Sequence, residues 1–274
     1  MGVQIPPLPF TLIIKSSQWS HHTLKQNYKL RGNSKVYILP ISDLHIGSPE
    51  FNEDYFQHCL DTIDNIQQDK RIYLCGDLLE AASKSVGNSA YQSTLPVEEQ
   101  IDLAISYLKP YRKDIVYSCM GNHEARLQKE FNLDVNHIIS KALRCPNGNQ
   151  TIDTFYINQS PVTVYAAHGK GSSAHFYTAE SKFLRETQHL EADIFLNGHN
   201  HRANYFTIPI RRADGVKRRH YVFTGAFLRY GGYANQMQLP ILPEAFIQLN
   251  INKEHRIRSN SFYIDETRPD LFQM

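Results

Sequence analysis

Residues 35–45 of the chain read KVYILPISDLH. The first seven, Lys35–Ile41, are mostly apolar and rich in β-branched and aromatic types, so they predict a short buried strand. Asp43 and His45, two residue types that bind metals, follow this run directly. Because the carboxyl ends of strands in an open α/β sheet converge on the crevice where ligands bind, this stretch predicts a strand that ends at a functional site.

The same pattern occurs four more times along the chain. The apolar runs and the polar residues that follow them are Arg71–Cys75 before Gly76-Asp77, Ile115–Cys119 before Gly121-Asn122-His123-Glu124, Val162–Ala167 before His168-Gly169, and Asp193–Leu196 before Gly198-His199-Asn200-His201. Five strand ends can therefore gather two aspartates, one asparagine and several histidines around one point.

Longer amphipathic stretches separate these runs and predict helices, which makes the alternation typical of an α/β fold. The predicted helices are Phe51–Gln68, Val97–Leu108, Val135–Leu143 and Phe176–Leu190. Toward the end of the chain helices are absent and strand-like runs follow one another, with Asp214-Gly215 as a turn between the first two. These runs, which predict a second, partly antiparallel sheet, are Tyr205–Ile210, His220–Thr224, Ala245–Ile251 and Ile257–Ile264.

Composition limits the class of protein. The chain has 274 residues, 41% of them hydrophobic, which suffices for one core, so we expect one domain over residues 35–274 and an N-terminal extension over residues 1–34. The formal charge of +2 excludes nucleic-acid binding by bulk charge alone, and any such contact must be local. No run approaches the roughly 18 apolar residues of a membrane helix, and the four cysteines are widely spaced. We expect a cytoplasmic protein without a membrane segment.

The side chains at the strand ends suit a particular chemistry. Imidazoles, carboxylates and one amide, without a thiolate, are ligands that Mn, Fe, Zn or Ni accept, and seven ligands are too many for one ion. Two divalent ions about 3.5–4 Å apart, bridged by a carboxylate, can hold a phosphoryl group and activate a water as the nucleophile. The composition of the site therefore predicts phosphoester hydrolysis.

In this order, the five polar blocks resemble the signature of the calcineurin-like metallophosphoesterases over about residues 36–201. The resemblance implies a four-layer sandwich, two packed mixed β-sheets flanked by helices, and two metal ions with manganese favoured. It implies Asp77 as the bridging ligand, His123 as the general acid that protonates the leaving group, and Glu80 as a carboxylate that orients this histidine. The other implied ligands are Asp43, His45 and His201 for one ion, and Asn122, His168 and His199 for the other.

The substrate class is less constrained by these motifs. Protein serine/threonine phosphatases have an arginine after their second motif that grips the phosphate, and here Ala81 takes that position, which favours phosphodiesters of the nucleotide or nucleic-acid type. Arg126 could supply such a clamp or be solvated. A phosphomonoesterase acting on nucleotides or phosphoproteins stays an alternative, as does a degenerate member that binds partners.

Two further loops and one basic cluster bear on the substrate. The Gly-rich loop Gly225–Tyr233, with Arg229 and Tyr230, should return close to the metals, and Lys170 directly follows His168-Gly169. We expect these residues to contact substrate, although the Gly-rich loop could serve only in packing and the segment at Lys170 could be only a flexible connection. A predicted hairpin tip, roughly 20 Å or more from the metal edge and thus out of reach of small substrates, could bind a long polymer or only be soluble. Its basic cluster consists of Arg211, Arg212, Lys217, Arg218 and Arg219.

Overall fold

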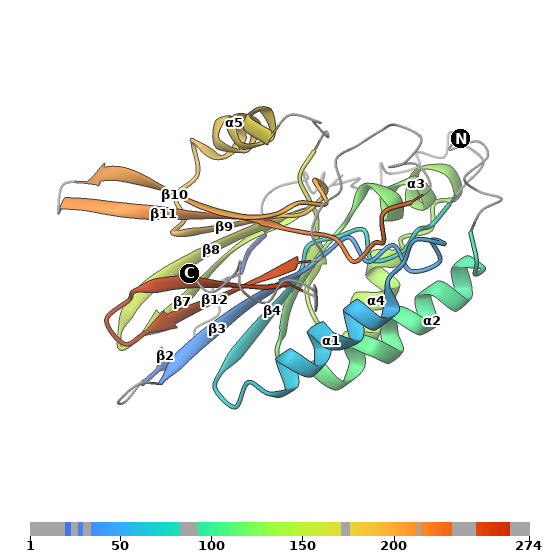
Figure 1. The fold of residues 1–274 in the computed structure, drawn as a ribbon, viewed down its shortest axis with the longest axis horizontal. Coiled ribbons are helices and arrows are strands. Elements are labelled where there is room, and N and C mark those ends of the chain that lie inside the picture. The colour runs from blue at the N-terminus through green and yellow to red at the C-terminus, as the bar shows by residue number, and fades with distance from the viewer. Residues whose placement is uncertain are drawn as a thin grey trace, which may run out of the picture.

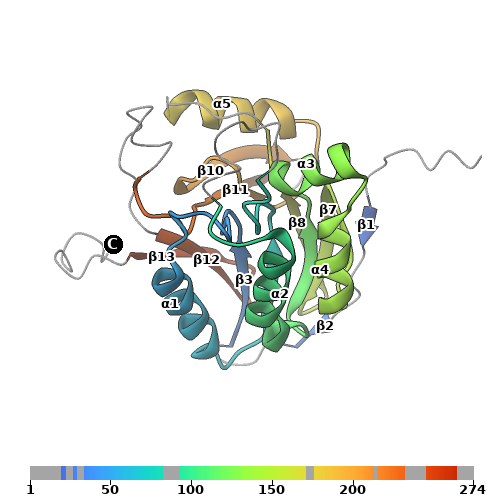
Figure 2. The ribbon, with the colours of Figure 1, turned by 90° about the vertical axis from the view of Figure 1, so that its right-hand side faces the viewer.

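The strand that leads to Asp43 lies inside a sheet that has helices over one face and a second sheet over the other. A computed structural model describes residues 20–22, 27–29, 34–82, 93–170, 176–212, 215–231 and 245–263. Within these ranges the elements form four layers, which Figure 1 and Figure 2 show from two sides. The predicted fold class, α/β with two packed mixed β-sheets flanked by helices, is confirmed.

The first sheet has six strands in the order β13-β12-β3-β4-β5-β6. Its three central strands are parallel to one another: β3 (Lys35–Ile41), β4 (Lys70–Leu74) and β5 (Ile115–Cys119). Parallel neighbours need crossover connections. α1 (Glu53–Asp64) and α2 (Val97–Leu108) are these crossovers. The remaining elements of this half are a 3-10 turn (Lys109–Tyr111), α3 (Asn122–Phe131), α4 (Val135–Leu143), β6 (Asn147–Gly148), β12 (Ala245–Asn252) and β13 (Ile257–Tyr263).

The second sheet has seven strands along the path β1-β7-β8-β9-β11-β10, with β2 also pairing with β7. Helix α5 (Phe176–Thr187) covers its outer face, where Phe183 meets the rings of Phe195 and Tyr221. The strand bounds are β1 Ser20–His22, β2 Asn27–Tyr28, β7 Gln150–Ile157, β8 Ser160–Ala167, β9 Ile194–Asn197, β10 Ala203–Arg212 and β11 Gly215–Thr224.

The two sheets pack against each other through a buried apolar layer that includes Ile38, Val164 and Ile194. Burying each such side chain stabilises the fold by roughly 1.5–3 kcal/mol. Two polar side chains interrupt this region. Tyr73 and Asp153 are both 0% exposed and lie beside each other, but neither the Tyr73 hydroxyl nor Asp153 Oδ2 makes a hydrogen bond of normal geometry. Burial raises the pKa of Asp153 to about 7.

The predicted helices and strands are present, with ends that differ by a few residues, but two expectations need correction. The C-terminal strands do not form a sheet of their own, because β10 and β11 join β9 in the second sheet while β12 pairs antiparallel with β3 in the first. The strand β7 was not expected from the sequence. Its inward-facing positions include Thr151 and Asp153, whose polar side chains hide the usual alternation of apolar and polar residues.

The segment interpreted as an N-terminal extension contributes strands. β1 and β2 pair in parallel with β7 at the edge of the second sheet. The division of the chain at residue 34 stays a prediction. No helix in the described part of the chain is long and apolar enough to span a membrane.

Candidate metal centre

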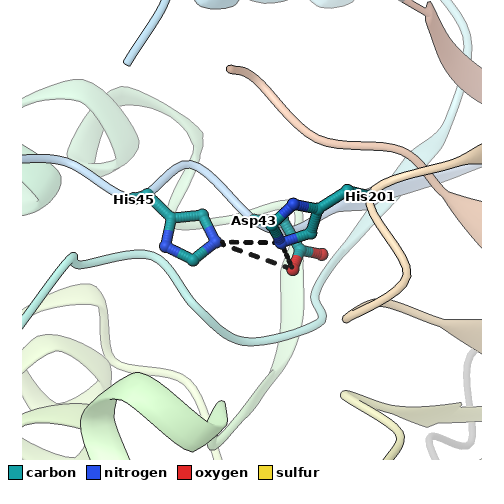
Figure 3. Close-up of side chains that lie close together, drawn as sticks. All are labelled: Asp43, His45 and His201. Carbon is teal, nitrogen blue, oxygen red and sulfur yellow. Dashed lines mark hydrogen bonds and ion pairs between the residues drawn. The ribbon is translucent and has the colours of Figure 1, made fainter. Parts of the chain in front are cut away.

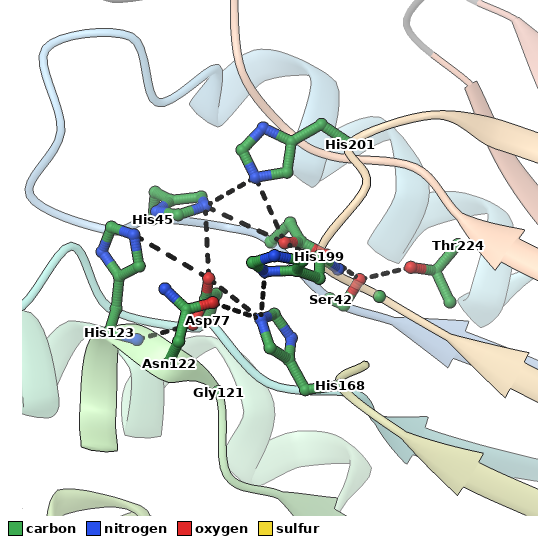
Figure 4. A network of polar contacts seen from close by, with 12 residues as sticks. Ser42, His45, Asp77, Gly121, Asn122, His123, His168, His199, His201 and Thr224 are labelled. Atoms are coloured by element: carbon green, nitrogen blue, oxygen red, sulfur yellow. Dashed lines mark hydrogen bonds and ion pairs between the residues drawn. The ribbon is translucent and has the colours of Figure 1, made fainter. Parts of the chain in front are cut away.

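The polar residues that follow β3, β4, β5, β8 and β9 come together where the carboxyl ends of the two sheets meet. Three groups of three side chains share members, and within each group the donor atoms lie within 4.8 Å of one another. With Asn122, which contacts one of the groups, they include all seven predicted ligands and His123 (Figure 4). Backbone loops from both sheets therefore build one polar cluster, as the sequence predicts.

The first group consists of Asp43, His45 and His201 (Figure 3). His201 Nε2 lies 3.3 Å from Asp43 Oδ1 and 3.2 Å from His45 Nε2. Two nitrogens bound to one ion at about 2.1 Å, with tetrahedral or octahedral angles, would be about 3.0–3.4 Å apart. The observed separation therefore fits a shared metal ion.

The second group consists of Asp77, His168 and His199, with Asn122 beside it. His168 Nε2 lies 3.1 Å from Asp77 Oδ2, 3.2 Å from His199 Nδ1 and 2.9 Å from Asn122 Oδ1. These are again nitrogen and oxygen donors at the separations that one ion imposes, and the group contains no sulfur.

Asp77 lies between the two groups. Its Oδ1 accepts a hydrogen bond of 2.9 Å from the backbone N–H of His123 at the start of α3, where the helix dipole favours negative charge. Its Oδ2 faces the cluster, 3.1 Å from His168 Nε2 and 3.9 Å from both His45 Nε2 and His123 Nε2. One oxygen is therefore fixed by the backbone, and the other points to both donor groups.

The loops that carry the ligands have an unusual backbone. Asp43, His45, Asp77, His199 and His201 all have positive φ, between 49° and 69°. For residues other than glycine this left-handed conformation costs roughly 1–2 kcal/mol each, and it persists only where the surroundings impose it. The packing of the sheets therefore holds the donors in place at the expense of local strain.

Glu124 is a site residue for which the sequence suggested no role. Its carboxylate is 2% exposed and accepts three backbone hydrogen bonds of 3.0 Å, from the N–H groups of Asp77, Leu79 and Gly121. A Cβ on Gly121 would lie 2.1 Å from the Asp77 backbone nitrogen, so the two loops pack backbone against backbone. Glu124 thus ties the loop of Asp77 to the loop of Asn122 and His123. Its position in the block Gly121-Asn122-His123-Glu124 is the signal that could have identified it.

The outer ring nitrogens of two predicted ligands are held by the protein. Glu80 Oε2 lies 3.1 Å from His45 Nδ1, and the Cys75 backbone oxygen lies 2.8 Å from His168 Nδ1. Such contacts fix the ring and leave Nε2 to face a metal. His123 Nδ1 lies 2.6 Å from the backbone oxygen of Glu80 and 3.7 Å from its carboxylate, so the main chain of Glu80 makes the closer contact with His123.

The charges of the cluster shift the pKa values of its members. Burial opposes ionisation of Asp77, but its hydrogen bond to His168 and the charge of that ring hold the pKa of Asp77 well below its usual range. Burial likewise favours the neutral ring of His168, yet Asp77 and Asp43 raise its pKa to about 10. Burial and the charge of His45 lower the pKa of His123 to about 4. The buried carboxylates thus require positive charge beside them, which metal ions would provide.

The predicted substrate-contacting residues lie at different distances from the cluster. Arg126 is beside it, with Nη1 3.4 Å from His123 Nδ1.

The loop with Arg229 returns as expected, because the Phe227 N–H donates to the Asp43 backbone oxygen at 3.0 Å. Arg229 itself pairs with Asp54 at 3.1 Å, near the start of α1. Tyr230 is 42% exposed and Lys170 is exposed. Tyr233 and Asp214 lie outside the described residues.

Comparisons with known proteins identify the family of this chain. The family model described as calcineurin-like phosphoesterase matches residues 36–232, and the chain therefore belongs to this family. No curated protein matches.

Several solved structures are similar at low identity. A predicted phosphoesterase from Streptococcus pneumoniae TIGR4 is 13% identical, with 85% of this chain and 99% of that chain covered and a TM-score of 0.36. A metallophosphoesterase from Sphaerobacter thermophilus is 16% identical, with 84% and 88% covered and a TM-score of 0.42. Vps29 from Entamoeba histolytica complexed with zinc is 14% identical, with 84% and 99% covered and a TM-score of 0.39. Such distant similarities do not distinguish among activities.

Proposed function

We propose that this chain hydrolyses phosphodiesters with two divalent metal ions. The observation that carries the proposal is the position of Asp77 Oδ2, which faces both donor groups while Oδ1 is fixed at the start of α3. A bridging carboxylate of a two-metal site needs this arrangement. The donors are nitrogen and oxygen only, which suits Mn, Fe, Zn or Ni, and we favour manganese.

Each donor group would hold one ion, and Asp77 would belong to both. Asp43, His45 and His201 would bind the first ion, and Asn122, His168 and His199 the second. When bound, two such ions withdraw charge from a phosphoryl group and make a water nucleophilic near neutral pH. The protein fixes the rings of His45 and His168 through Glu80 and the Cys75 backbone oxygen. Substrate would therefore meet a rigid set of positions.

His123 is the proposed general acid. Its Nδ1 is engaged by the Glu80 backbone oxygen, so Nε2 is the nitrogen that faces the cluster. In the protein alone its pKa lies at about 4, through burial and the nearby charge of His45. A bound phosphoester brings negative charge beside this ring, which favours its protonated form and thus proton donation to the leaving oxygen.

A diester is the favoured substrate because the buried Ala81 occupies the position of the arginine that would clamp a monoester dianion. A specific observation supports phosphomonoesters as the second candidate. Arg126 lies 3.4 Å from His123 Nδ1 and could form such a clamp from α3. The described cysteines are free thiols, three of them buried, which supports a reducing compartment such as the cytoplasm.

Turnover of model esters tests the proposal. Protein reconstituted with Mn, Ni, Zn or Mg should cleave bis(4-nitrophenyl) phosphate with a higher kcat/KM than 4-nitrophenyl phosphate. A preference for the monoester that Arg126→Gln abolishes, and that the matched exposed-arginine control Arg112→Gln retains, would establish the monoesterase instead. Absence of turnover with every metal, in protein that binds two equivalents, would leave a partner-binding member of the family.

A further inference from the structure

The hairpin of β10 and β11 extends beyond the rest of its sheet. β11 pairs with β9 only from His220 to Phe223, whereas its pairing with β10 continues back to Gly215. Residues 215–219 therefore belong to a two-stranded ribbon, and Figure 1 shows this ribbon projecting past the neighbouring strands. The ribbon is exposed from Gly215 to Arg218.

The hairpin that forms this ribbon has a larger net positive charge than the whole chain. Residues 211–219 include four arginines, one lysine and one aspartate, which sum to +4, so the remaining residues of a chain with net charge +2 sum to −2. Within the described part of the chain, no ion pair joins Arg211, Arg218 or Arg219 to a carboxylate. The net positive charge therefore lies on one projecting element, and the rest of the chain is slightly acidic in sum.

The cations lie on both faces of the ribbon. The Arg219 guanidinium stands 5.6 Å from the centre of the Phe195 ring, on the face that α5 covers further along the strand. Lys217 is two residues away and shares that face by strand alternation. Arg218 donates to the Thr207 hydroxyl at 3.1 Å on the opposite face, and Arg211 is on the same side as Arg218 by register.

We propose that this ribbon binds double-stranded nucleic acid by lying in a groove. A groove presents phosphates on two sides, which matches a ribbon with cations on both faces, whereas a flat membrane surface would meet only one face. The major groove is about 12 Å wide and admits a two-stranded β-ribbon. Contacts of this kind neutralise phosphates without reading sequence, and they release counterions.

The ribbon also has a fixed relation to the metal centre. β11 ends at Thr224, whose hydroxyl hydrogen-bonds the Ser42 hydroxyl beside Asp43. Lys217 lies seven residues before Thr224, about 23 Å along the strand at ~3.3 Å per residue. Arg219 lies five residues before Thr224, about 17 Å along the strand. At 3.4 Å per base step, a duplex needs about 5–7 base pairs to span this distance. That the bound polymer is also a substrate depends on the proposed phosphodiesterase function, but its binding does not.

Binding of a fluorescein-labelled DNA duplex of about 20 base pairs, followed by anisotropy in EDTA at several KCl concentrations, tests the proposal. The hairpin variant is Arg211→Gln/Lys217→Gln/Arg218→Gln, which keeps Arg219 on the Phe195 ring. The matched control, Lys109→Gln/Arg112→Gln/Lys113→Gln, removes three exposed cations from the end of α2 and the turn that follows. The hairpin variant should bind at least about tenfold more weakly, with a salt slope lower by about 2–3, while the control binds like the unmodified protein.

Several outcomes would overturn the inference. The first is a hairpin variant that binds duplex as tightly as the unmodified chain, and the second is a control variant that loses as much affinity as the hairpin variant. The third is tighter binding of single-stranded DNA of the same length. The fourth is stronger competition by polyglutamate than by unlabelled duplex. Turnover of bis(4-nitrophenyl) phosphate is measured in parallel and should be equal in both variants. Duplex binding without any diester turnover would refute the proposed function and leave this inference standing, and turnover without duplex binding would do the reverse.

Discussion

Two regions of this molecule bury aspartates almost completely, and the pKa values of these aspartates shift in opposite directions. Asp43 and Asp77 in the metal centre are 0% and 1% exposed, and Asp153 between the sheets is 0% exposed. The pKa values of Asp43 and Asp77 are lowered against the effect of burial by hydrogen bonds and charges from His201 and His168. The pKa of Asp153 is raised to about 7, because burial outweighs its contacts with Tyr73 and Thr151.

Burial alone therefore does not make a site. In the metal centre the loops turn histidine nitrogens and backbone N–H groups toward Asp43 and Asp77, and the left-handed conformations of these two residues are part of that arrangement. Between the sheets Asp153 is on a regular strand beside an apolar layer, and the hydroxyls of Thr151 and Tyr73 are near its carboxylate. The metal centre thus carries strain and a defined charge pattern, which a purely structural polar residue lacks.

The largest effect is expected when the shared carboxylate is removed. Asp77→Ala should lose both metal equivalents and at least about 10³-fold in diester turnover, because several kcal/mol of charge stabilisation depend on both ions. His45→Ala should chiefly lose one equivalent. His45 is a predicted ligand of the first ion only, the one that Asp43 and His201 would also bind. Elemental analysis of purified protein measures both. Two equivalents and normal turnover in Asp77→Ala would refute the ligand assignment.

The role of His123 can be separated from that of the ligands by the leaving group. His123→Ala should lose about 10²–10⁴-fold in rate with an alkyl ester, whose leaving oxygen needs a proton, and far less with nitrophenyl esters. Metal content should stay near two equivalents. The geometry also places His123 in a group with His45 and Asp77, so lost metal, or equal losses with both leaving groups, would show that it is a ligand or a structural residue.

Glu124 offers a test of the backbone arrangement itself. Glu124→Gln keeps the shape but replaces one acceptor oxygen by an amide nitrogen, so at least one of the three N–H groups of Asp77, Leu79 and Gly121 loses its partner. We expect metal affinity to fall by about 10–100-fold, as for other residues that orient ligands. Titration with Mn²⁺ measures this, with Glu98→Gln, the same change at an exposed position on α2, as the control. Unchanged affinity would mean that Glu124 contributes only to folding.

The sequence predicts that the candidate ligands lie together, because each one follows an apolar strand and strand ends share one edge of a sheet. It does not predict the role of Glu124, because the N–H groups that it binds become available only through the left-handed turn at Asp77. The ion pair of Arg229 with Asp54 depends on the path of two loops that are far apart in the chain. Strand β7 was missed because the buried Asp153 breaks the alternation by which strands are recognised.

The smallest effect concerns Asp153, and its sign is opposite to that of the others. The folded protein holds the Asp153 proton up to a pH of about 7, whereas the unfolded chain releases it near the ordinary value of 3.8. Between these values the folded state binds more protons, so its stability falls as the pH rises, by at most about 4 kcal/mol for about three pKa units. Asp153→Asn cannot ionise and should be more stable than the unmodified protein at pH 8, by about 1–2 kcal/mol because the buried amide keeps part of the cost, and nearly equal at pH 4.

Urea unfolding of both proteins at pH 4, 6 and 8 measures the difference in stability. The control must be an aspartate without structural hydrogen bonds, which excludes Asp193, because its carboxylate accepts hydrogen bonds from Thr163. Asp102→Asn, at an exposed position on α2, is the matched control and should leave the pH dependence unchanged. A variant less stable than the unmodified protein at pH 8 would mean that Asp153 is compensated in its ionised form. The contrast between the two buried regions would then disappear, because both would supply partners to their carboxylates, and strain at the ligand loops would be the one difference left between them.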